Sequence, residues 1–115
     1  PCIFCGISEN PEEKSRKVYE DENYVAFHDI NPSARLHILI VPRRHIENVM
    51  SLSIKDINMI REMKALGHML LAKNQVPLKD HHLGFHVPPF TSVPHLHLHV
   101  IARPFKNWVR SAKYP

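Results

Sequence analysis

The chain has only two cysteines among its 115 residues, too few for a framework of disulfide bonds. It also has no apolar run that approaches the ~20 residues of a membrane-spanning helix, and no basic-then-apolar leader opens it. These absences argue against a membrane span and against secretion. We therefore expect a protein of the cytoplasm, the nucleus or both, whose cysteines serve as thiols or as metal ligands.

Acidic residues are absent from the segment 103–115. That segment carries the whole net charge of +4, on Arg103, Lys106, Arg110 and Lys113. A basic tail of this kind is either solvated or meets a polyanion such as a nucleic acid strand. Trp108 within it could stack on a base, or dock on the core or on a partner subunit. We expect one domain at 1–102, with the tail as part of it or packed on it.

The hydrophobic pattern predicts an α+β domain. Apolar residues that follow Ser53 recur at three- and four-residue spacing, which predicts one long amphipathic helix that ends before Pro77. Ser53 and Asp56 are placed for a capping box at its start. Strands are expected at 18–20, 24–29, 36–41, 83–87 and 95–102, and a short helix or turn at 3–8. The expected fold is a five-stranded antiparallel sheet with the long helix on one face.

Ten residues are histidines, and three of them alternate with apolar residues at 95–100. Because successive side chains of a strand point to opposite faces, His95, His97 and His99 would line one face. Three such imidazoles could simply face solvent, or two of them could hold a zinc ion. They could also perform phosphorus chemistry, in which one imidazole attacks while its neighbours orient it and move protons.

The segment Cys2-Ile3-Phe4-Cys5 has the spacing of a zinc-binding pair. A structural zinc site needs two further ligands, so the pair could equally be two thiols without a metal. A redox function is least favoured, because no βαβ unit surrounds the motif.

Three segments, taken together, resemble the histidine triad family. They are the alternating histidines, the segment 26–32 around Asp29, and the segment 36–46 that contains His37. The segment 83–90 is similar to the branch of histidine triad nucleotide-binding protein 3, to which aprataxin is close. The resemblance extends from Cys2 to about Arg103 and implies the same α+β fold.

The resemblance implies a chemical role for each of three histidines. His97 would attack the α-phosphorus of a nucleotide joined to an amine or another leaving group, and water would hydrolyse the resulting nucleotidyl-histidine. His99, with His37 as its partner, would hydrogen-bond the phosphate and take part in proton transfer to the leaving group.

The implied activity is hydrolysis of adenosine 5′-phosphoramidates and related adenylates by a homodimer that needs no catalytic metal. One alternative is the removal of adenylate from a DNA 5′ end, as in aprataxin. Another is a nucleotide-binding adaptor with negligible turnover.

The resemblance also implies a nucleotide pocket and a zinc site. Asp29 would bind the ribose, because an ionised carboxylate can accept hydrogen bonds from both hydroxyls. The base would lie among apolar residues, and these include Phe4, Phe27, Ile30 and Leu39. Ser92 and His86 would contact the phosphate or the leaving group, beside a proline-rich segment that offers few backbone N–H donors. A structural zinc ion would be held by Cys2, Cys5, His45 and His95.

Overall fold

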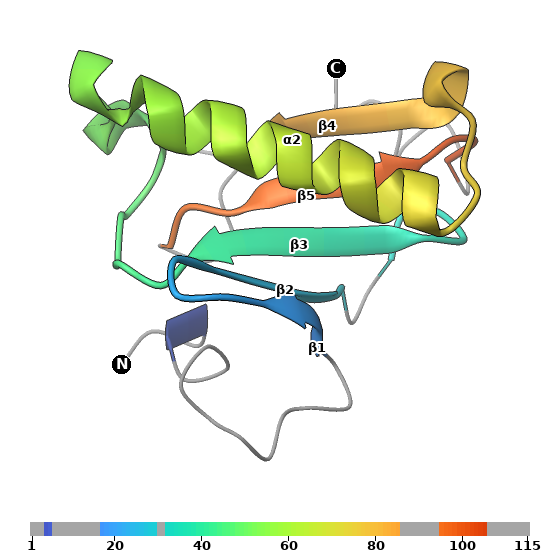
Figure 1. The fold of residues 1–115 in the computed structure, drawn as a ribbon, viewed down its shortest axis with the longest axis horizontal. Coiled ribbons are helices and arrows are strands. Elements are labelled where there is room, and N and C mark those ends of the chain that lie inside the picture. The colour runs from blue at the N-terminus through green and yellow to red at the C-terminus, as the bar shows by residue number, and fades with distance from the viewer. Residues whose placement is uncertain (1–3, 6–16, 30–31, 86–94, 106–115) are drawn as a thin grey trace.

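The computed structural model describes residues 4–5, 17–29, 32–85 and 95–105 (Figure 1). Three short 3-10 turns, at Val49–Ser51, Ile54–Asp56 and Leu78–Asp80, accompany the regular elements. Those elements are β1 (Lys17–Glu20), β2 (Tyr24–His28), β3 (His37–Pro42), α2 (Ile57–Lys73), β4 (His81–Phe85) and β5 (Leu98–Ala102). No helix in these ranges is long and apolar enough to cross a membrane.

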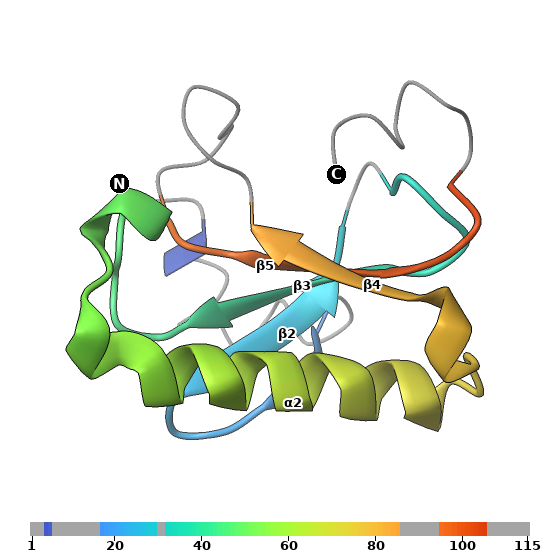
Figure 2. The same ribbon diagram turned by 90° about the horizontal axis from the view of Figure 1, so that it is seen from above.

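The strands form one sheet in the order β1-β2-β3-β5-β4, and every neighbouring pair is antiparallel. The helix α2 runs along one face of this sheet (Figure 2). The predicted fold class is therefore confirmed. Of the short helix predicted at 3–8, the structure describes only Phe4 and Cys5, which are helical.

Strand β5 begins three residues later than predicted. Both of its neighbours pair with it only from Leu98 onward, and the backbone N–H of Leu96 donates instead to the carbonyl of Ile46. The segment ahead of Leu98 therefore pairs with the loop that contains Ile46 and not with the neighbouring strands. Within this segment, His95 lies in a bend. Strand β4 begins two residues earlier than predicted, and the end of its predicted range, 86–87, lies outside the described residues.

The helix begins with the predicted capping box. The Asp56 carboxylate accepts hydrogen bonds from the backbone N–H of Ser53 at 2.9 Å and from its hydroxyl at 3.3 Å. One 3-10 turn therefore precedes the α-helix. At the other end the helix stops at Lys73, and Gln75 takes a positive φ of 64° before the chain reaches Pro77.

The alternation of side chains in the central strands separates two apolar clusters. One lies between the sheet and α2 and includes Ile38, Ile40, Leu98 and Val100. The other contains Phe4, Val25, Phe27, Leu39 and Val41. Since alternate residues of a strand face opposite sides, this second cluster lies on the sheet face away from α2. That face carries the candidate site.

The helix α2 covers the sheet face that lies opposite the candidate site. Leu71 has no exposed surface and belongs to the cluster under the helix, whereas Met69 on the same helix is 45% exposed. We expect Leu71→Ala to lower the free energy of unfolding by about 2–5 kcal/mol, because it opens a cavity. Met69→Ala should lower the free energy of unfolding by well under half of the loss caused by Leu71→Ala. Urea unfolding of both variants measures the difference, and equal losses would contradict the assignment.

Candidate active site

Three histidines that sequence analysis assigned to catalysis meet on the sheet face away from α2. His37 opens β3, His99 lies in β5, and His97 directly precedes β5. The ring centroids of His37 and His99 are 5.1 Å apart, and those of His97 and His99 are 4.9 Å apart. All three side chains are buried. The structure thus brings the predicted catalytic residues into one cluster.

A backbone carbonyl fixes the chemical form of His97. Its Nδ1 lies 2.6 Å from the carbonyl oxygen of His95. A carbonyl oxygen can only accept, so Nδ1 must carry the proton. In the neutral ring Nε2 then holds a lone pair, which is the form that a nucleophilic imidazole requires.

His37 connects His99 to the loop ahead of β3. Its Nδ1 accepts a hydrogen bond from the backbone N–H of Ser33 at 3.0 Å, and its Nε2 lies 2.8 Å from Nδ1 of His99. The carboxylate of Asp29, which follows β2, lies 3.4 Å from the same Nε2. The predicted ribose ligand is therefore adjacent to the predicted catalytic histidines.

The apolar residues predicted to hold the base pack beside these histidines. The Phe4 ring makes edge contacts with Phe27, at a centroid distance of 5.4 Å, and with His97, at 4.9 Å. Leu39 joins them in the same cluster and pairs with His99 across β3 and β5. The predicted pocket residues Ile30, His86 and Ser92 lie outside the described residues.

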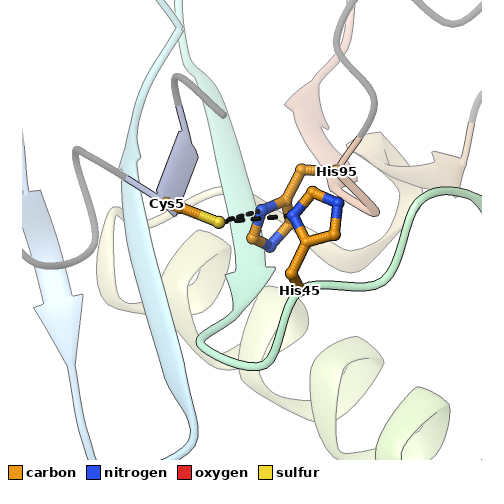
Figure 3. A group of neighbouring side chains, drawn as sticks. All are labelled: Cys5, His45 and His95. Atoms are coloured by element: carbon orange, nitrogen blue, oxygen red, sulfur yellow. Dashed lines mark hydrogen bonds between the residues drawn. The ribbon is translucent and has the colours of Figure 1, made fainter. Parts of the chain in front are cut away.

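A second group of side chains gathers where the N-terminal turn meets the loop after β3 (Figure 3). The Sγ atom of Cys5 lies 3.3 Å from Nδ1 of His45 and 3.3 Å from Nδ1 of His95. His95 donates its Nε2 proton to the carbonyl of Pro42 at 2.9 Å, so in the neutral ring its Nδ1 holds a lone pair. Burial lowers the pKa of His95, with smaller contributions from His45 and His97, and favours this neutral form.

These three side chains can hold a metal ion, since their ligand atoms all lie within 4.8 Å of one another. A metal-bound histidine usually donates its other ring proton to a carbonyl or a carboxylate, as His95 does here. Three of the four predicted zinc ligands are therefore assembled. The fourth, Cys2, lies outside the described residues.

Other described histidines make contacts with residues outside these two groups. Nδ1 of His68, on α2, is 2.7 Å from Nδ1 of His81, and His82 contacts Arg103 at 3.0 Å. His28 is exposed at the end of β2. Of the basic tail, the structure describes only 103–105, where Phe105 forms a β-bridge with Ala34.

Ser33 belongs to the site but was not predicted from the sequence. Its contribution to the cluster is a backbone N–H, which every residue except proline possesses. No side-chain pattern could have marked it.

Comparisons with known proteins agree with this geometry. A family model described as "Scavenger mRNA decapping enzyme C-term binding" matches residues 1–114. Adenosine 5′-monophosphoramidase HINT3 of Danio rerio is 48% identical over 102 residues, which are 88% of this chain and 64% of that protein. Aprataxin of Gallus gallus is 32% identical over 105 residues, which are 89% of this chain and 32% of that protein. The chain thus spans less than two thirds of either relative.

Solved structures have the same architecture. A histidine triad protein from Clostridium difficile aligns with a TM-score of 0.79 and 30% identity, covering 90% of each chain. A Zn-bound histidine triad family protein from Mycobacterium smegmatis aligns with a TM-score of 0.71 and 28% identity, over 90% of this chain and 75% of that one.

The fold is a five-stranded antiparallel sheet with a helix on one face, and the histidine cluster lies on the other face. Together they define a class of α+β proteins. The chain belongs to the histidine triad family. The resemblance noted from the sequence is confirmed.

Proposed function

We propose that the chain hydrolyses adenosine 5′-phosphoramidates and related adenylates through a nucleotidyl-histidine intermediate. The observation that carries this proposal is the hydrogen bond from His97 Nδ1 to the carbonyl of His95, which leaves a lone pair on Nε2 of His97. The similarity to a protein named as an adenosine 5′-monophosphoramidase supports the same reaction.

The first step forms a bond between Nε2 of His97 and the α-phosphorus, while the bond from phosphorus to the leaving group breaks. Phe4, Phe27 and Leu39 offer an apolar surface for the base beside His97. Asp29 would bind the ribose hydroxyls. Water then attacks the phosphorus, releases AMP and restores His97. Dividing one displacement into two easier ones is the advantage of a covalent intermediate.

Hydrolysis of a 5′-adenylate on DNA is a second candidate. It would use the same nucleophile, and the similarity to aprataxin together with the basic tail favours it. A nucleotide-binding adaptor with negligible turnover is a third, and it would form no covalent adduct.

Replacing His97 tests all three candidates. We expect His97→Ala to reduce turnover of adenosine 5′-phosphoramidate on the order of 1,000-fold or more, because the variant has no nucleophile. His68→Ala, which removes a histidine far from the site, is the control and should retain full activity. The same rates on 5′-adenylated DNA, at one fixed salt concentration, separate the first two candidates. If wild type and His97→Ala are equally inert on both substrates, the enzyme proposal fails and the adaptor is favoured.

We also propose that Cys2, Cys5, His45 and His95 hold a structural zinc ion. The assembled group around Cys5 supports it, as does the similarity to a zinc-bound member of the family. When bound, zinc would fasten the N-terminal turn to the loops that flank the sheet. It would take no part in the chemistry at phosphorus.

Metal analysis tests the zinc proposal. Wild type should purify with one zinc ion per chain, and Cys5→Ser should lose most of it, because zinc prefers a thiolate ligand. His68→Ala should keep its zinc and so controls for loose binding to surface histidines. Equal zinc content in wild type and Cys5→Ser would contradict the site.

We further infer that the chain acts as a homodimer in the cytoplasm, the nucleus or both. Strand β4 ends the sheet, and the outer edge of such a strand can pair with another chain. Sedimentation equilibrium should then give twice the 13.4 kDa chain mass. A monomer at micromolar concentration would contradict the dimer.

A further inference from the structure

We propose that the backbone amide of Ser33, acting through His37, holds His99 as a neutral hydrogen-bond donor. In this form His99 binds the phosphoryl group and does not supply the proton of the leaving group. The inference rests on the proposed function for its substrate, but its structural part can be tested without any activity.

The backbone N–H of Ser33 fixes the tautomer of His37. A backbone N–H can only donate, and that of Ser33 lies 3.0 Å from Nδ1 of His37. Nδ1 of His37 must therefore hold a lone pair. A neutral imidazole carries its single proton on the other nitrogen, so His37 is protonated on Nε2.

His37 in turn fixes the tautomer of His99. The protonated Nε2 of His37 lies 2.8 Å from Nδ1 of His99, which must accept. His99 then carries its own proton on Nε2. Asp29 reinforces this order, because its carboxylate, 3.4 Å away, also favours a proton on Nε2 of His37.

An additional proton has no favourable position on this pair. On Nδ1 of His37 it would face the Ser33 N–H, and on Nδ1 of His99 it would face the His37 N–H. Among the described residues, the titratable groups that approach the pair include Asp29, beyond β2, and His97, ahead of β5. The Asp29 carboxylate favours positive charge on His37, but it approaches Nε2, which already carries a proton. It therefore offers no new position for a second proton. Burial of both rings also opposes a charge.

Loss of a proton is equally unfavourable. If His99 gave its Nε2 proton to a leaving amine, the ring would become an imidazolate. Transfer of the His37 proton to His99 would only move that negative charge to His37, beside the Asp29 carboxylate. His99 can therefore donate a hydrogen bond to a phosphoryl oxygen as negative charge develops there, but it is a poor acid.

The proton of the leaving group then comes from a donor other than His99, and solvent can supply it without any further residue. With a phosphoramidate, a hydronium ion from solvent would protonate the amine nitrogen first. His97 Nε2 then bonds to phosphorus, and the P–N bonding pair leaves on the nitrogen as neutral amine. In the second step water attacks phosphorus, the bond to His97 breaks, and the surplus proton returns to solvent.

Nitrogen-15 NMR of the imidazole rings tests the structural part directly. At neutral pH we expect the protonated-nitrogen signature at Nε2 of both His37 and His99, and at Nδ1 of His97. The His37→Leu variant should leave His99 as a mixture of tautomers, whereas His28→Leu, at the exposed end of β2, should leave it unchanged. A cationic His99, or a proton on its Nδ1 in wild type, would overturn the inference.

Kinetics test the functional part. Glutamine can place an N–H near the position of histidine Nε2 but cannot give up its proton. We expect His99→Gln to stay within about 10-fold of wild type, and His99→Ala to lose roughly 100–1,000-fold, the usual cost of removing one such donor. For each variant, the fold-loss in turnover should be the same with adenosine 5′-phosphoramidate as with the p-nitrophenyl ester of AMP. The leaving group of that ester needs no proton.

A loss by His99→Gln of more than about 100-fold that is confined to the phosphoramidate would show that His99 supplies the proton, against our inference. If wild type turns over neither substrate, the proposed function fails instead. The NMR result would then still decide the tautomer of His99.

Discussion

The antiparallel pairing of β3 with β5 is the constraint on which the rest of the molecule depends. It sets His99 opposite Leu39, and His37 opposite Ile101. Because the register fixes which residues share a face, the same pairing directs Ile38, Ile40 and Val100 toward α2. A slip of one residue would exchange the histidines with the core. The apolar cluster under the helix thus holds the histidine-bearing face in register.

The backbone determines the protonation of the site more than side chains do. The carbonyl of His95 sets the tautomer of His97, the carbonyl of Pro42 sets that of His95, and the amide of Ser33 sets that of His37. Main-chain groups do not titrate, so the nitrogen that holds the proton in each neutral ring is set by partners whose own charge is fixed. An arrangement of this kind is preorganised, which lowers the reorganisation that catalysis would otherwise require.

Much of this structure could be predicted from the sequence, for physical reasons that differ between elements. Apolar residues at every second position, or at every third and fourth, mark one buried face, and this spacing located the sheet and the helix. The capping box was located by Ser53 and Asp56. The facing of His97 and His99 followed from the same alternation. The start of β5 could not be predicted, because it depends on a bond between Leu96 and Ile46, which are distant in sequence.

Phe4 and Cys5, which are adjacent in the chain, link the cluster around His97 to the group around His95. Phe4 contacts the ring of His97, and Cys5 contacts His95, which is 90 residues away along the chain. Contacts of such long separation close large loops, and closing them costs conformational entropy. Because Phe4 and Cys5 are neighbours in the chain, a change that loosened Cys5 from His95 would also release the Phe4 ring from His97.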